Sequence, residues 1–230
     1  RRVDQIQGET ASSPAFVSLL HGSLDQVLGQ TFEAVQRVNY DENINARLIV
    51  EGHGGDDYFA MDDNAAITTL DGGAGNDRFQ IGQLFGSERT APDVAVLDQF
   101  PLDAGVIETT RGFMSRGNSF ALVAQGGSGA DQFTVFSNEA ELRLEGDTGN
   151  DEFIVRAFAL VGSDEFSTKE STEVDAGAGD DFIQYDINAP VSIDGGEGFD
   201  RVVVLGTELD DAFVIARNGI FGAGLNVQVS

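Results

Sequence analysis

The sequence contains no cysteine, four prolines and two histidines. Without cysteine, neither a disulfide nor a thiolate metal site can form. The two histidines, His21 and His53, share no repeat position, which argues against a transition-metal site built on imidazole. The low proline content stands beside 29 glycines, a balance that predicts many tight turns rather than a disordered tail.

Two further absences concern the membrane and the cell's export routes. No window of about 18 apolar residues occurs, so we expect no membrane span. No signal peptide is visible. The chain opens with Arg-Arg rather than methionine, and we therefore expect it to be part of a longer polypeptide.

Basic residues are also scarce, and Lys169 is the only lysine. The 39 acidic residues against 13 basic ones give a net charge of −26. Such a chain should repel nucleic acid and anionic lipid, and it should attract multivalent cations. A solvated acidic surface would explain part of this charge, but many of the acids recur at fixed positions of a repeat.

That repeat is the stretch "DGGAGNDRFQI" and its relatives. Copies of eleven residues begin at Glu51, Asp71, Gln125, Glu145, Asp175 and Asp194. Numbered from the first residue, position 5 is always glycine, position 9 is always large and apolar, and position 11 is apolar or aromatic. Position 7 is always aspartate: Asp57, Asp77, Asp131, Asp151, Asp181 and Asp200.

The spacing of these aspartates predicts the architecture. They lie 20, 54, 20, 30 and 19 residues apart, and a step near 20 suits one coil of a β-solenoid with two strands and two turns. The apolar alternation after each aspartate predicts a strand with one face inward. We therefore predict an all-β fold, a parallel β-solenoid over residues 46–230, with insertions at 82–120 and 156–173.

The two ends of the chain lack the full motif. In residues 1–45, apolar residues at helical spacing predict a capping helix, or alternatively irregular coils. Ser23 and Gln26 could form its capping box. The helical series is Leu24, Val27, Leu28, Phe32, Val35 and Val38. At the other end, "GTELDDAFVI" over 206–215 has lost the glycines and is interpreted as a worn coil that binds nothing.

Stacked coils would bring the repeated aspartates together in three pairs: 57 with 77, 131 with 151, and 181 with 200. At the strand spacing of about 4.8 Å, two such charges repel by roughly 3 kcal/mol at an effective dielectric of 20. The fold then needs either raised carboxyl pKa values or a cation between the carboxylates. The glycines allow carbonyl groups to turn toward the same place, and hard oxygen ligands of this kind suit Ca²⁺.

The pattern Gly-Gly-x-Gly-x-Asp-x-apolar-x resembles the nonapeptide of the RTX, or haemolysin-type, calcium-binding repeat. The copies that begin at Gly72, Gly126 and Gly195 match it fully. The other three each depart at one glycine, where His53, Asp147 or Ala176 stands. The resemblance covers residues 50 to 215.

This resemblance implies a right-handed β-roll or β-helix that orders on binding calcium, in a secreted or surface-attached bacterial protein. It implies about three Ca²⁺ ions, one for each aspartate pair, with a fourth where Asp151 meets Asp181. The ligands would be the aspartates of position 7 with backbone carbonyls of positions 2, 4 and 6, such as those of Gly72, Ala74 and Asn76. The candidate metal residues are Gly52, Gly54, Asp57, Gly72, Ala74, Asp77, Gly126, Ser128, Asp131, Gly146, Thr148, Asp151, Ala176, Ala178, Asp181, Gly195, Glu197 and Asp200.

Other interpretations stay open beside this one. The repeats could form tight turns without metal. Parallel β-helices also carry sugar hydrolases and lyases, for which Asp62 with Asp63 or Asp210 with Asp211 could supply paired carboxylates. We expect no enzyme, but a structural segment whose partners are calcium, the rest of its polypeptide and an extracellular or cell-surface glycan.

Overall fold

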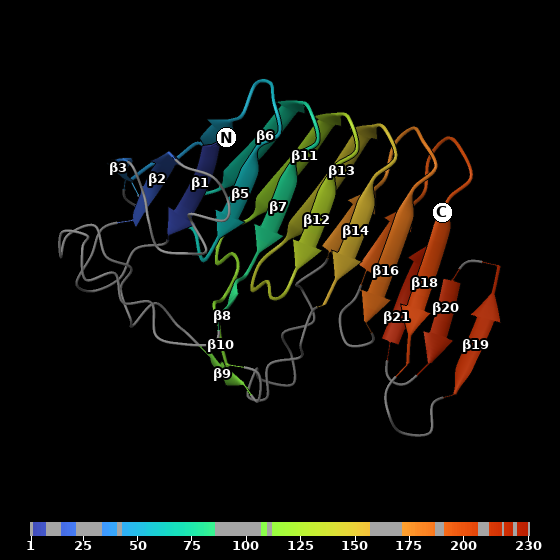
Figure 1. Ribbon diagram of the computed structural model, residues 1–230. Helices are drawn as coiled ribbons and strands as arrows, with labels where there is room; N and C mark the ends of the chain where they lie inside the picture. Colours follow the sequence, from blue (N-terminus) through green and yellow to red (C-terminus); the bar gives the residue numbers. More distant parts are fainter. Residues whose placement is uncertain are drawn as a thin grey trace.

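The computed structural model describes residues 2–7, 15–21, 34–40, 43–85, 107–109, 112–156, 172–186, 191–206, 212–217, 219–222 and 225–229. The fold is all-β, and the described residues contain no helix, hence none that could cross a membrane. Two sheets with six parallel strands each lie face to face and run along the length of the molecule (Figure 1). Each sheet reaches nine strands through three further strands at one end.

The front sheet contains the strands that follow each repeat aspartate. They are β5 (Tyr58–Met61), β7 (Arg78–Ile81), β12 (Gln132–Val135), β14 (Glu152–Val155), β16 (Phe182–Asp186) and β18 (Arg201–Leu205). The back sheet contains the strands that lead into each motif. They are β4 (Leu48–Glu51), β6 (Thr68–Ala74), β11 (Leu122–Ser128), β13 (Leu142–Thr148), β15 (Thr172–Asp175) and β17 (Val191–Asp194).

The core lies between the two sheets, because the apolar residues at positions 9 and 11 alternate with outward-facing polar ones. In the front sheet, Phe59, Phe79, Phe133 and Phe153 pair in register and stack with ring centroids 4.9, 4.7 and 4.7 Å apart. The back sheet contributes a matching row to the core: Val50, Leu70, Ala124, Leu144, Val174 and Ile193.

The chain alternates between the sheets, and we call one back strand, its motif turn and the following front strand a coil. The motif turns form one long edge, at the top of Figure 1, and the returns from front to back sheet form the other. The chain leaves the return edge after Gln83 and rejoins it at Ser115, whose N–H donates to Gln83 O at 2.9 Å. Between these points lie the antiparallel strands β8 (Leu84–Phe85), β9 (Ile107–Thr109) and β10 (Gly112–Met114).

The N-terminal end differs from the sequence-based prediction. Strands β1 (Arg2–Gln7), β2 (Ala15–His21) and β3 (Ala34–Tyr40) extend the front sheet, with β1 parallel to β5 and antiparallel to β2. The predicted helix is wrong for Val35 and Val38, which lie in β3, and residues 22–33 of that prediction lie outside the described residues. Backbone pairing within the meander outweighs the helical spacing of the apolar residues.

At the C-terminal end, three strands extend the back sheet. They are β19 (Phe213–Ala216), β20 (Gly219–Gly222) and β21 (Leu225–Val229). Strand β21 pairs in parallel with β17, and β20 and β19 follow in antiparallel order. The interpretation of 206–215 as a worn coil is therefore wrong, because β19 pairs with β20 and not with a strand of the coil stack.

Candidate functional site

The six repeat aspartates form one continuous ladder along the motif edge. In each step, the backbone N–H of one aspartate donates to Oδ1 of the aspartate in the next coil. The five distances are 2.7, 2.7, 2.8, 2.8 and 3.1 Å, from Asp57 through Asp77, Asp131, Asp151 and Asp181 to Asp200. The first five of these residues are buried, although aspartate is a side chain that proteins seldom bury unpaired.

This arrangement differs from the three separate pairs inferred from sequence distance. Asp131 follows Asp77 directly in the ladder, although 54 residues separate them in the chain. Asp181 likewise follows Asp151 across 30 residues. The insertions leave the stack at the return edge, so their length does not alter the contacts at the motif edge.

In four of the ladder aspartates, the second carboxylate oxygen, Oδ2, is the one that lacks a hydrogen-bond partner among the described residues. Within the described part of the chain, Oδ2 of Asp77, Asp131, Asp151 and Asp181 is buried and has no hydrogen-bond partner. A buried polar atom without a partner costs about 1–3 kcal/mol, and more when the group is charged. Four such atoms in a row indicate that a proton or a cation belongs beside them.

The glycine at position 2 makes the space for this oxygen. A Cβ on Gly72 would lie 2.3 Å from Asp77 Oδ2 and 2.8 Å from the carbonyl oxygen of Gly126 in the next coil. At Gly146 the corresponding atoms are Asp151 Oδ2 at 2.5 Å and the carbonyl oxygen of Ala176 at 2.3 Å. At both glycines, a carboxylate oxygen and a carbonyl oxygen, both hydrogen-bond acceptors, border the same space.

Burial and mutual repulsion hold the carboxyl groups toward their neutral form. Burial first, then the charges of Asp131 and Asp57, raise the pKa of Asp77 to about 6. Burial and the neighbouring carboxylates likewise raise the pKa of Asp151 to about 7. The pKa values of Asp131 and Asp181 are raised mainly by burial. In the absence of a cation, the ladder binds protons more tightly than ordinary aspartates do.

The candidate residues at position 4 also stack. Gly54, Ala74, Ser128, Thr148, Ala178 and Glu197 are neighbours in that order. Their carbonyls already accept the N–H of position 5 in the preceding coil, as Ser128 O does from Gly75 at 2.9 Å. Because the position 4 carbonyls already accept a hydrogen bond, while the position 2 carbonyls of Gly126 and Ala176 border the space of an unpaired Oδ2, position 2 is the better source of further ligands.

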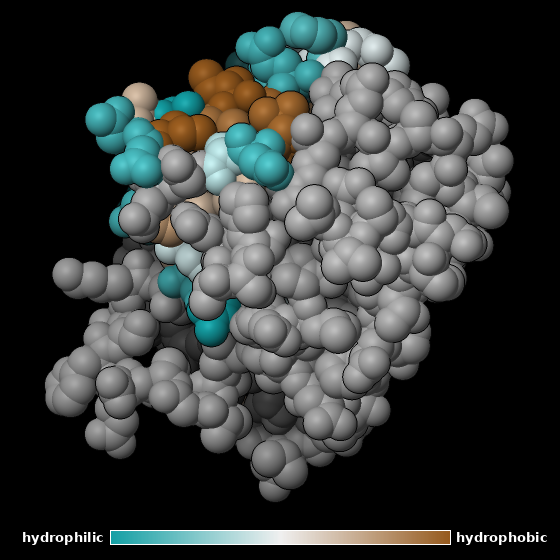
Figure 2. All heavy atoms as spheres, turned by 90° about the vertical axis from the view of Figure 1, so that its left-hand side faces the viewer, coloured by the Kyte–Doolittle hydropathy of each residue, from teal (hydrophilic) through white to brown (hydrophobic). Residues whose placement is uncertain are grey.

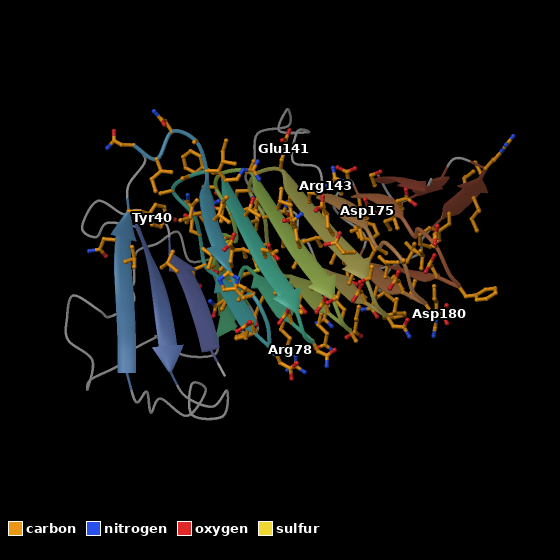
Figure 3. All side chains as sticks on the ribbon, turned by 90° about the horizontal axis from the view of Figure 1, so that it is seen from above. Tyr40, Arg78, Glu141, Arg143, Asp175 and Asp180 are labelled. Carbon is orange, nitrogen blue, oxygen red and sulfur yellow. The ribbon has the colours of Figure 1, made fainter. Side chains whose placement is uncertain are left out.

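The acids of position 1 lie on the outer face of the back sheet. Arg143 contacts three of the acids there: its Nε lies 2.6 Å from Glu145, and its Nη atoms lie 3.9 Å from Glu173 and 3.5 Å from Asp175. Figure 3 shows Arg143 and Asp175 together on this side of the stack, whereas Arg78 and Asp180 are on the opposite side. These position 1 acids face away from the aspartate ladder and add only to the field around it.

Sequence reasoning missed a second ladder at position 6, exposed and opposite in direction. Here a side-chain oxygen accepts the N–H of the following coil, as Asp56 Oδ1 does from Asn76 and Asn76 Oδ1 does from Ala130. Asn150 and Asp180 continue it. Four of the six copies carry Asp or Asn at this position, and that preference was the available signal.

A third ladder, also missed, lies at the return edge. Asn64, Asn118 and Asn138 each stand four residues before a back-sheet strand begins. Asn64 Nδ2 donates to Ala66 O and to Phe120 O in the next coil, at 3.0 and 3.1 Å. Its Oδ1 accepts the N–H of Phe120 at 2.9 Å. The asparagine that recurs four residues ahead of these three strands could have predicted it.

In the described residues, no three or more His, Cys, Asp or Glu side chains are gathered as a metal site. Comparison with protein-family models, curated proteins and solved structures gives no match. The RTX resemblance therefore rests on the repeat residues themselves.

Proposed function

We propose that this chain binds calcium ions along its motif edge and serves as a structural, calcium-stabilised segment of a secreted or surface bacterial protein. One observation carries the proposal: four buried Oδ2 atoms have no hydrogen-bond partner among the described residues, and those of Asp77 and Asp151 border the same space as a carbonyl oxygen of the next coil. Neutralising this row of acceptors with a cation would remove the cost of burying it, so binding energy would become folding energy.

The architecture that fits this role is a right-handed parallel β-solenoid. Two parallel sheets whose strands alternate along the chain support this inference. The hand follows from the general rule that connections between parallel strands of one sheet are right-handed in nearly all cases.

The donor set favours calcium over other ions. Carboxylate and carbonyl oxygens are hard ligands, and Ca²⁺ accepts six to eight of them in flexible geometry, whereas Mg²⁺ demands a tight octahedron. The described part of the motif edge offers a single imidazole, His53, which is exposed and lies 3.8 Å from Glu51. That pair lies outside the aspartate ladder.

The ladder also changes the expected number of ions. All five steps between coils repeat the same aspartate geometry, so an ion can be held at each step rather than once per sequence pair. The copies that depart from the glycine pattern keep the same features. Ala176 presents its carbonyl oxygen toward Gly146, and His53 and Asp147 adopt positive φ angles of 70° and 67° in place of glycine.

No specific observation favours the carbohydrate-active alternative. Asp63 Oδ1 accepts the N–H groups of Asn64 and Ser119 at 2.8 and 3.0 Å, a role that stabilises the return turn. Asp210 and Asp211 lie outside the described residues. Calcium binding would not conflict with a glycan partner of the longer polypeptide, which stays a prediction from the sequence.

The test compares Asp77→Asn with Asp180→Asn. Asparagine at 77 keeps an oxygen for the N–H of Asp57 and replaces Oδ2 with an amide that can donate to Gly126 O. Calorimetric titration should then show fewer bound Ca²⁺ ions, while the metal-free variant should melt at a higher temperature than the unsubstituted chain. Asp180→Asn keeps the exposed ladder and should change neither quantity.

Far-UV circular dichroism and thermal melting in EGTA, in Ca²⁺ and in Mg²⁺ complete the experiment. We expect Ca²⁺ alone to raise the melting temperature. If Ca²⁺ has no effect, or if Asp77→Asn binds calcium like the unsubstituted chain, the proposal is wrong and the ladder is held by protons.

A further inference from the structure

The two ends of the molecule have complementary shapes. At the N-terminal end the front sheet extends beyond the coils by β1, β2 and β3, while the back sheet stops at β4. At the C-terminal end the back sheet extends by β21, β20 and β19, while the front sheet stops at β18 (Figure 1). Each overhang is three strands wide, and in the described part of the chain neither is faced by a second sheet.

The N-terminal overhang turns an exposed apolar residue toward the core side. Val38 in β3 pairs with Val17 in β2. Val17 pairs in turn with Ile6 in β1, and Ile6 pairs with Met61 in β5. Residues paired in this way share one face of a sheet. Val17 and Met61 are buried on that face, yet 62% of Val38 is exposed. Figure 2 views this end, and the residues coloured there include a hydrophobic patch in the upper part.

The C-terminal overhang has the same property. Ile215 in β19 pairs with Ile220 in β20. Ile220 pairs in turn with Val227 in β21, and Val227 pairs with Val191 in β17. Val191 is buried in the core, whereas 80% of Ile215 is exposed. An isoleucine on the inward face of a sheet and open to solvent marks a surface suited to a partner.

Strand direction at both open edges is compatible with further pairing. Strand β19 is antiparallel to β20, which is antiparallel to β21, so β19 runs parallel to β17 and to β4. By the same reasoning β3 runs parallel to β5 and to β18. In each overhang, two antiparallel pairings restore the direction of the coil strands, so β19 can pair with a β4 and β18 can pair with a β3.

We propose that these ends join head to tail, the C-terminal end of one copy receiving the N-terminal end of a second copy. Strand β19 of one copy would pair with β4 of the second, and β18 of the first would pair with β3 of the second. Both sheets contain nine strands, so a single translation continues both together. The equal overhangs would then face each other as opposite walls, burying Ile215 and Val38.

The occupant is therefore a second copy of this chain rather than an unspecified protein. An isolated peptide strand could pair with one edge, but it would leave the opposite sheet's overhang open. Exposed sheet edges favour pairing with other chains, and here two such edges lie at each end. The net charge of −26 opposes association, so the joint should strengthen as added salt screens the repulsion. This inference is independent of the proposed calcium sites.

The experiment uses sedimentation velocity of the whole chain at high micromolar concentration in salt and Ca²⁺. We expect concentration-dependent association into a series of elongated species. Ile215→Asp should weaken this association about ten-fold or more, because it places a charge where an isoleucine would be buried. Val38→Asp should do the same from the other end. Val214→Asp is the matched control, since its register with Phe221 places it on the outer face of β19.

Mixing the two variants decides the geometry. Ile215→Asp retains an intact N-terminal end, and Val38→Asp retains an intact C-terminal end, so the mixture should form a one-to-one dimer and nothing larger. A monomeric unsubstituted chain overturns the proposal. So does either variant that alone dimerises as strongly as the unsubstituted chain, since that result would mean that like ends join, or a Val214→Asp chain weakened as much as Ile215→Asp. Unchanged circular dichroism spectra confirm that the exposed substitutions leave the fold intact.

Discussion

The motif edge and the return edge of this molecule follow opposite rules. The motif turn contains the same number of residues in all six copies. The return edge varies in length, from the equal connections that follow β5 and β12 to the long insertion between Gln83 and Ser115. The motif edge therefore sets the spacing of the coils, while the return edge accommodates added chain.

Close backbone packing explains the strictness of the motif edge. At position 5, a Cβ on Gly149 would lie 1.5 Å from the carbonyl oxygen of Gly129, and one on Gly129 would lie 1.9 Å from Gly75 O. These glycines also have positive φ angles of 137° and 135°. Gly55, in the first coil, has nothing within 4 Å of its Cβ position, because no motif turn precedes it.

The largest expected effect comes from breaking this contact. Gly129→Ala should lower the free energy of unfolding by roughly 3–4 kcal/mol, from the strained φ angle together with the clash against Gly75 O. Gly55→Ala has the strained φ angle alone and should cost about 1 kcal/mol. Urea denaturation of both variants, at saturating Ca²⁺, measures the difference. Equal losses would show that coil stacking is looser than the structure indicates.

A smaller effect should come from the asparagine ladder of the return edge. Asn64 is buried, and its side chain makes four hydrogen bonds, to Ala66, Thr68 and twice to Phe120. Asn64→Ala should therefore cost about 2–3 kcal/mol. Asn138 makes two longer bonds, to Ala140 at 3.2 Å and Thr172 at 3.4 Å, so Asn138→Ala should cost about 1 kcal/mol. Denaturation midpoints of the two variants test this order.

Much of the fold was predictable because it depends on local patterns. The apolar alternation at positions 9 and 11, as in Phe133 and Val135, predicts inward-facing strands, and the recurring aspartate predicts that they align. The aspartate pairs were less predictable, because the residue count between Asp77 and Asp131 does not reveal where the excess chain leaves the stack. The N-terminal helix failed because Val35 and Val38 fit helical spacing, while pairing with β2 depends on partners distant in sequence.

The pH dependence of the metal-free protein should belong to the motif edge. The pKa of Asp77 is raised to about 6 and that of Asp151 to about 7, above the ordinary value near 4, so folding takes up protons. Stability should be greatest below about pH 4 and should fall as the pH rises through 6 and 7. Melting curves in EGTA across this range measure the effect.

Asp151→Asn is the informative variant for this pH dependence, because it removes the group with the higher of the two pKa values. The fall in melting temperature near pH 7 should become shallower. Asp180→Asn, on the exposed ladder, serves as the control and should change the curve far less, because Asp180 is only a lesser cause of the raised pKa of Asp181. A metal-free protein whose melting temperature rises from pH 4 to 7 would contradict the buried ladder.

The smallest effect is expected from shortening the insertion between Gln83 and Ser115 at the return edge. Replacing residues 86–111 with a short Gly/Ser linker keeps the pairing of Phe85 with Phe113 and the Gln83–Ser115 hydrogen bond. The entropy of closing a loop changes slowly with its length, so the free energy of unfolding should change by less than about 1 kcal/mol. Calcium stoichiometry should not change, because the Asp77–Asp131 step lies at the opposite edge. A decrease in the free energy of unfolding comparable to that of Gly129→Ala would mean that residues 86–111 help to hold the coils together. Both edges would then determine the spacing of the coils.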